Sequence, residues 1–158
     1  MASAEERIAQ LGLVLPEPPK PAGLYSPYVI TGNLLYLSGN GPRLPDGSFA
    51  RGKVGADVTV DQAREHARLV GMVLLSHARN ALGSLDRVVR VVKLLGMVNA
   101  VPEFTDQPRV IDGCSNLFIE VFGENGRGAR SAVGMGSLPM QITVEIEAIF
   151  EISPSTRA

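Results

Sequence analysis

Few residue types in this 158-residue chain are suited to metal or cofactor chemistry. Its one cysteine, Cys114, excludes an internal disulfide and a zinc site built from several cysteines, and its place on a predicted helix indicates a small core residue. His66 and His77 stand eleven residues apart in one predicted helix and make no convincing metal pair, so surface or packing roles are expected. Residues 123–128 are rich in glycine but lack the strand-to-helix context of a dinucleotide motif. We therefore predict no metal site and no cofactor.

Charged side chains near the C-terminal end offer a different chemistry. Arg130 follows the glycine-rich stretch, and a planar guanidinium makes two parallel charge-assisted hydrogen bonds to a carboxylate, which lysine cannot reproduce. Glu145 and Glu147 alternate with apolar residues, and a carboxylate on a rigid strand can direct a water molecule and manage its proton. Without further context, such an arginine is usually a solvated side chain, and such glutamates form the polar face of a sheet.

The composition is that of an ordinary globular protein. The length fits one domain, and 45% hydrophobic residues suffice for a core. Fifteen basic and 16 acidic residues give a net charge of −1, which lacks the cationic footprint of nucleic-acid binding. The first ten residues are charged, unlike a secretory signal, and no window reaches the ~20 apolar residues of a membrane helix, so we expect a soluble cytoplasmic protein. A mean hydropathy of +0.13 mildly favours an oligomer.

The N-terminal segment is predicted to be an appendage. Residues 3–13 combine a capping-box pattern, Ser3 with Glu6, and one apolar stripe, which together predict a short amphipathic helix. Four prolines between positions 16 and 21 cannot continue a helix and indicate an extended linker. We therefore divide the chain into an arm, residues 1–22, and one domain, residues 23–153.

The domain is predicted to contain two amphipathic helices and five strands. The strands and helices that must position Arg130 and Glu145 follow one another along the chain in the order ββαβαββ. Residues 87–98 are ambiguous, because their cations recur every third residue as on a helix, but their many valines favour a buried strand. The expected strands are 29–31, 34–38, 87–98, 129–135 and 142–152, and the expected helices run from Thr59 or Asp61 to about 82 and from 108 to 122.

The last strand alternates clearly between two faces. Ile142, Val144, Ile146 and Ala148 point to one face, and Thr143, Glu145 and Glu147 point to the other. We expect the apolar face to lie under both helices, which places the carboxylates on the face away from them. The predicted fold class is therefore α+β, a mixed sheet with two helices on one face.

Several segments, in order, resemble one known family. Leu24–Ser26 resembles the Gly-Pro-Tyr-Ser stretch that opens RidA/YjgF proteins, and Leu35–Asn40 resembles their second strand, which ends in Ser-Gly-Gln. The most specific block joins Ala129–Ser131, Leu138–Pro139 and Val144–Ala148 at the family's usual separations. The resemblance spans most of the chain, from about residue 23 to 151. The chain is therefore similar to the RidA/YjgF, or L-PSP endoribonuclease-like, family of reactive intermediate deaminases.

The resemblance implies a structure and an activity. It implies a chorismate-mutase-like subunit and a homotrimer whose sheets form a central barrel, with clefts between subunits. Active members hydrolyse 2-imino acids, or their enamine tautomers, to 2-keto acids and ammonia without metal or organic cofactor. By resemblance, Arg130 binds the substrate carboxylate and Glu145 positions or activates the attacking water. Tyr25, from the neighbouring subunit, and Ser38 line the same cleft, and the backbone at Ala132 contacts the imine end of the substrate.

The chain also departs from the family pattern. Where the second helix usually offers asparagine, this chain has Ser115, or Asn116 if the register shifts by one residue. Ala132 replaces a common cysteine, and Gly134–Gly136 replaces bulkier residues, which would widen the pocket. The retained arginine favours a carboxylate ligand, and the altered surroundings leave the preferred imine open.

Three other functions stay open at this point. A non-catalytic trimer that binds a keto acid at the same arginine is the main alternative. An L-PSP-type endoribonuclease is disfavoured by the balanced charge and by the lack of an aromatic and basic surface. A chorismate-mutase-type rearrangement ranks last, because only one convincing cation lines the predicted cleft.

Overall fold

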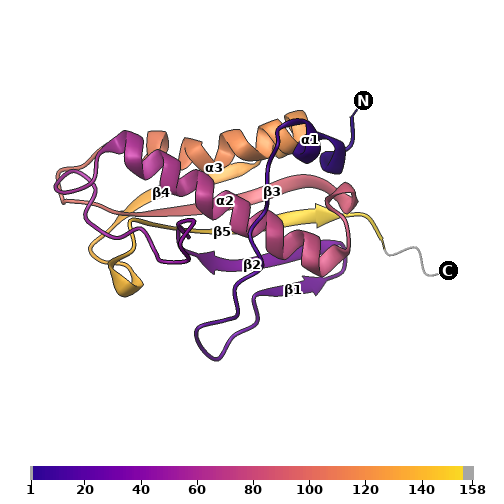
Figure 1. The fold of residues 1–158 in the computed structure, drawn as a ribbon, viewed down its shortest axis with the longest axis horizontal. Helices are drawn as coiled ribbons and strands as arrows, with labels where there is room; N and C mark the ends of the chain where they lie inside the picture. The colour runs from indigo at the N-terminus through magenta and orange to yellow at the C-terminus, as the bar shows by residue number, and fades with distance from the viewer. Residues whose placement is uncertain (1, 155–158) are drawn as a thin grey trace.

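The computed structural model describes residues 2–154 as a five-stranded mixed sheet with two long helices on one face (Figure 1). The sheet order is β1-β2-β5-β3-β4, in which only β3 and β4 pair in parallel. The helices are α1 (Ala4–Gln10), α2 (Val60–Leu82) and α3 (Gln107–Phe122), with single 3₁₀ turns at Leu85–Arg87, Gly123–Gly126 and Pro139–Gln141, and the strands are β1 (Tyr28–Thr31), β2 (Leu34–Asn40), β3 (Val88–Asn99), β4 (Ala129–Met135) and β5 (Val144–Ile152).

These bounds confirm the predicted α+β class and the strand at 87–98. Three ends differ from the prediction by two residues or more. The second strand runs on to Asn40, two residues beyond its predicted end, because it keeps pairing with β5 after a bulge. The first helix stops at Gln10, because the chain turns at Gly12 with a φ of +64°. The last strand begins two residues later than predicted, since a 3₁₀ turn precedes it, although Ile142 is buried as expected. The placement of Thr143 on the open face was wrong: it precedes the strand, outside its alternation, and is buried with its hydroxyl 3.0 Å from His66 of α2.

The helix ends follow their sequence signals. Ser3 caps α1 and Thr59 caps α2, and each forms a complete capping box with Glu6 and Gln62 respectively. Gly83 ends α2 in the left-handed region with a φ of +81°. Of the two predicted caps for α2, the structure therefore selects Thr59.

The core lies between the helices and one face of the sheet. The predicted inner face of α3 is buried in full, including Cys114, whose thiol pKa burial raises above its usual value. Phe118 on α3 meets Phe150 on β5 edge to face, with ring centroids 5.4 Å apart. Along β5, alternate residues from Val144 to Ile152 are buried, as the sequence predicted.

The N-terminal arm packs onto the helices. Ile8 is buried in the core, and Arg79 of α2 donates to Glu5. Ser76 then donates to the carbonyl of Pro16, which fixes the linker against α2. In Figure 1 the linker passes α2 and runs down to β1, the edge strand of the sheet. The arm is therefore tied to the domain at both ends, although the division at residue 22 stays a prediction.

Both histidines have structural surroundings. His66 is half-buried, with Nδ1 3.0 Å from the Thr143 hydroxyl, and His77 is buried with no hydrogen-bond partner for Nδ1 within residues 2–154. Desolvation lowers the pKa of each. Among the described residues, no three His, Cys, Asp or Glu side chains gather as metal ligands, and no helix is long and apolar enough to cross a membrane.

Candidate functional site

The guanidinium of Arg130 lies on the helix-covered side of the sheet, at its edge. Arg130 pairs in register with Leu94 of β3, which is buried under the helices. Its Nη1 donates to Oδ1 of Asp112 at 2.8 Å and to Oγ of Ser115 at 3.0 Å, both on α3. These two acceptors stand one helical turn apart and face the same side of α3. The arginine is thus held in one orientation by a carboxylate and a hydroxyl.

The rest of the Arg130 guanidinium is available to a ligand. Nε and Nη2 make no hydrogen bond within residues 2–154, and the side chain is 24% exposed. It opens into a cavity of about 190 Å³ that Ser115 and Asn116 also line. Two parallel donors at a cavity mouth match the two oxygens of a carboxylate. Both residues weighed for the asparagine position therefore lie at this cavity, and Ser115 is the one that contacts the arginine.

Glu145 lies on the opposite, open face of the sheet. Its side chain is half-buried and makes no hydrogen bond or ion pair with any residue of 2–154. Its carboxylate rests against Gly39, where any Cβ would overlap it. Burial, and then the neighbouring charge of Glu147, raises the pKa of Glu145 above the usual value for glutamate. Such a carboxylate is suited to accept a proton from a bound water near neutral pH.

Tyr25 and Ser38 share the cavity of Glu145. This cavity measures about 590 Å³ and lies between the end of the arm, the segment after β2 and the turn before β5. Ser38 donates to the carbonyl of Ser26 at 2.7 Å, and the Tyr25 hydroxyl accepts from the backbone of Ala22 at 3.3 Å. Both polar side chains are therefore positioned by hydrogen bonds to residues 22–26, the segment just before β1.

Within one chain the predicted site residues form two separate groups. Arg130 and Ser115 lie at one cavity, and Glu145, Tyr25 and Ser38 at the other. The register Arg130–Leu94–Ala148 puts Arg130 and Glu145 two strands and three residues apart, roughly 14 Å between Cα atoms. Ala132, on the same edge strand as Arg130, lines neither cavity. One chain alone therefore does not bring Arg130 and Glu145 into a single cleft, and the resemblance had placed that cleft between subunits.

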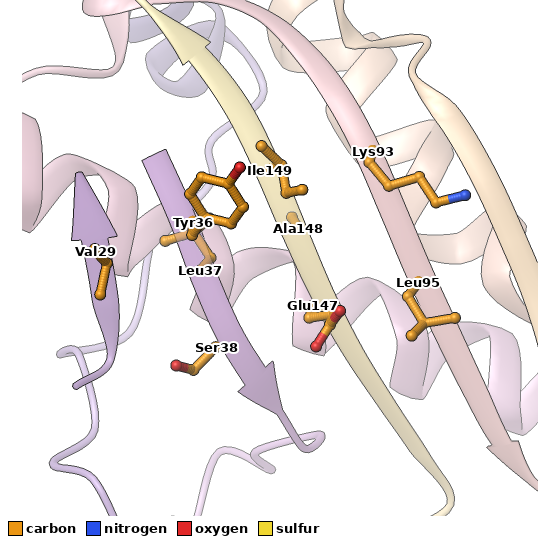
Figure 2. A pocket seen from close by; sticks show the side chains of 9 residues that line it. All are labelled: Val29, Tyr36, Leu37, Ser38, Lys93, Leu95, Glu147, Ala148 and Ile149. Atoms are coloured by element: carbon orange, nitrogen blue, oxygen red, sulfur yellow. The ribbon is translucent and has the colours of Figure 1, made fainter. Parts of the chain in front are cut away.

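A second surface lies on the open face beside Glu147. A shallow hollow of about 310 Å³ there is lined mainly by apolar side chains (Figure 2). Val29 and Tyr36 are 54% and 41% exposed, and Leu95 and Ile149 stand beside them on the central strands. Lys93 also lines this hollow, and its Nζ donates to Oγ of Ser131 at 3.2 Å. We call the residues Val29, Tyr36, Leu95, Ile149 and Val133 the open-face patch.

Sequence reasoning missed two contributors. Asp112 holds Arg130, and its spacing of three residues from Ser115 was a usable signal, since the two share a helix face. Gly39 borders Glu145, but nothing in the sequence marks it as more than a strand-end glycine.

The chain is a small α+β subunit with an arginine anchored at one cavity and a half-buried glutamate at another. Residues 5–150 match the family described as "YjgF/chorismate mutase-like, putative endoribonuclease". The chain belongs to this family, as the sequence resemblance indicated.

Relatives cover nearly the whole chain. Protein TCP17 of Trypanosoma cruzi is 42% identical over 147 residues, 92% of each chain. The solved structure of the protein Atu1372 from Agrobacterium tumefaciens is 46% identical, with a TM-score of 0.86, and covers 96% of this chain and 94% of its own. A protein named 2-iminobutanoate/2-iminopropanoate deaminase, from Dermatophagoides farinae, is 29% identical over 87% of this chain and 92% of its own.

Proposed function

We propose that this protein hydrolyses small 2-imino acids, or their enamine tautomers, to 2-keto acids and ammonia. The proposal rests on two side chains. The guanidinium of Arg130 is held by Asp112 and Ser115 while its Nε and Nη2 stay available to a ligand, and the carboxylate of Glu145 is half-buried with a raised pKa. A family relative bears the name of an enzyme with this activity. The reaction needs no metal or organic cofactor, because an imine carbon is already electrophilic.

The proposed reaction assigns one task to each group. Arg130 binds the substrate carboxylate through Nε and Nη2, while Asp112 and Ser115 keep the guanidinium in place. Water adds to the imine carbon as Glu145 takes one of its protons, and Glu145 then passes this proton to the nitrogen to give a carbinolamine. The hydroxyl proton of the carbinolamine moves to the nitrogen by the same route, the C–N bond breaks, ammonia leaves, and the C=O of the keto acid forms. General acid–base help of this kind typically contributes about 10²–10⁴-fold.

We propose further that the site is shared between copies in a homotrimer. Arg130 and Glu145 are on opposite faces of one sheet, so a substrate that touches both needs a second subunit. The open-face patch supports this assembly, since exposed apolar side chains on a sheet face are typical of interfaces. In such a trimer, Tyr25, Ser38 and Glu145 of one subunit meet Arg130, Ser115 and the Ala132 backbone of the next. The cytoplasmic location expected from the sequence stays a prediction.

The test of the proposed function follows imine decay. A pyridoxal-phosphate dehydratase generates 2-iminobutanoate from threonine, and semicarbazide traps the imine that has not been hydrolysed. Wild type is expected to reduce trapping, and Arg130→Ala is expected to abolish that effect. Arg109→Ala, an exposed arginine paired with Asp61, is the matched control and is expected to act like wild type. If wild type fails to accelerate hydrolysis of several 2-imino acids, the deaminase proposal is wrong.

Two other functions have clear signatures. A non-catalytic carboxylate-binding trimer would show keto-acid stabilisation that Arg130→Ala removes, without faster imine loss. An endoribonuclease would need a cationic surface, whereas arginines 68, 79, 90, 109, 127 and 130 all pair with carboxylates. Together with a net charge of −1, this pairing disfavours binding of a phosphate backbone.

A further inference from the structure

The cavity of Glu145 contains a cation that the proposed reaction does not use. Arg43 lines this cavity, and its Cζ lies 4.8 Å from the centre of the Phe49 ring. Its Nη1 donates to the carbonyl of Gly47 at 2.7 Å. Within residues 2–154 it has no carboxylate at ion-pair distance, as is also true of Arg7, Arg51, Arg64 and Arg87.

The loop around Arg43 is built to hold it. Arg43 and Phe49 are bridge partners, and the Leu44 amide donates to the carbonyl of Ser48 at 2.9 Å. The one acidic group in the loop, Asp46, is occupied by Ser48, whose amide and hydroxyl both donate to its Oδ1. The guanidinium is therefore stacked and oriented, and the nearby acid is turned to another partner. A preorganised cation loses little freedom when it binds an anion.

Arg43 and Glu145 line one cavity of about 590 Å³, which has room for a small molecule with two charged ends. Gly39 borders the Glu145 carboxylate, and Gly41 borders Phe49, the ring that Arg43 stacks on. Glu147 lies further along β5, on the side of Glu145 away from Phe49. The exposed Lys20 of the arm adds a second cation to the lining of the same cavity.

We infer that Arg43 binds a second carboxylate and makes this protein selective for dicarboxylic 2-imino acids and their keto-acid products. This inference rests on the proposed function for the orientation of the substrate. Arg130 of the neighbouring copy holds the carboxylate next to the imine, and Arg43 holds the one at the end of the side chain. A neutral side chain of the same length leaves Arg43 without a partner, so it binds more weakly.

Binding measured without turnover tests the inference. The probes are 2-oxoglutarate and 2-oxopentanoate, two keto acids with the same five-carbon chain, of which only the first has a second carboxylate. Isothermal titration of the full-length protein is expected to give a Kd about tenfold lower for 2-oxoglutarate, the size of one charge-assisted contact. Arg43→Gln is expected to remove this preference and to leave the Kd of 2-oxopentanoate unchanged. Arg109→Gln, on the helix side, is expected to keep it.

Three results overturn the inference: equal affinity of wild type for the two keto acids, a preference that survives in Arg43→Gln, or no binding of either. Hydrolysis of 2-iminobutanoate and of the dicarboxylic 2-iminoglutarate by the same variants separates this inference from the proposed function. If wild type shows the binding preference but accelerates the hydrolysis of neither imine, the deaminase proposal fails and the assignment of Arg43 stands. If it accelerates hydrolysis without the preference, the reverse holds.

Discussion

The two faces of the central sheet are made by the same strands but meet different surroundings. On the helix side, Val144, Ile146 and Phe150 are fully buried under α2 and α3. On the open side, Tyr36 and Val133 stay 41% and 37% exposed, although Leu35 and Leu37, which flank Tyr36, are in the core. The helix face is complete within one chain. The open face exposes several large apolar side chains, which is unusual for a sheet face that contacts only water.

This difference between the two faces separates the residues that stabilise the fold from those of the proposed site. The helix face supplies the packing energy, and it also holds Arg130 at its edge through α3. The open face carries Glu145 and the larger cavity. Each face contributes one half of the proposed site. Substitutions on one face only can therefore test what that face contributes to activity, stability and assembly.

The largest expected effect is on the chemistry of the open face. Glu145→Gln keeps the shape of the side chain but removes the proton acceptor, so kcat is expected to fall by about 10²–10⁴-fold. Keto-acid binding at Arg130 should change little, because the two groups bind different parts of the substrate. Single-turnover imine decay and titration with 2-oxobutanoate measure these two quantities. A fall in affinity with unchanged kcat would contradict the assigned role.

A second substitution tests the helix face. Phe118→Ala removes a fully buried ring that contacts Phe150 and Phe122, and it is expected to cost about 3–5 kcal/mol of stability. Val14→Ala, at a position 83% exposed on the arm, is the control and should be neutral. Chemical denaturation at a fixed protein concentration gives both values. A loss below about 1 kcal/mol for Phe118→Ala would mean that the helix face is not the main source of stability.

A third substitution tests whether the open face is covered. Leu95→Glu places a charge in the open-face patch, and burying it between subunits would weaken assembly by about 100-fold or more. The circular dichroism spectrum should stay native, since Leu95 points away from the core. Sedimentation velocity is expected to show trimers for wild type and for the exposed control Val14→Glu, and monomers for Leu95→Glu. Trimers of Leu95→Glu would show that this patch is not the interface.

The smallest expected effect is a shift in pH dependence. Glu145 acts when deprotonated, so activity should fall as pH drops through its raised pKa. Glu147→Gln removes the neighbouring charge that contributes to this rise, so the acidic limb of kcat/KM should move to lower pH. A pH–rate profile of both proteins makes the comparison. An unmoved limb, or one moved to higher pH, would contradict the role of Glu147 in tuning Glu145.

The fold was predictable because it depends on periodicity. The alternation in β5 and the three-and-four spacing in α2 gave the correct faces, and the valine content of 88–98 gave the correct strand. The ends of elements were less accurate where glycine or a 3₁₀ turn interrupts a pattern, as at Gly12 and before Val144.

The site was predictable only as a set of residues. Their types and order pointed to Arg130 and Glu145, but a face assignment for Arg130 needs the register of β4 against β3, which local patterns do not contain. Arg43 was missed for the same reason. Its stacking on Phe49 and the occupation of Asp46 by Ser48 arise from a loop whose conformation no periodicity encodes.

The shared site is tested most directly by mixing two inactive variants. Arg130→Ala and Glu145→Gln are co-expressed, so that mixed trimers contain some clefts with the native arginine from one subunit and the native glutamate from the next. Random assembly restores about a quarter of the clefts, and the mixture is expected to regain about a quarter of wild-type imine hydrolysis. A mixture as inactive as either variant alone would show that both groups act within one chain, and it would contradict the account.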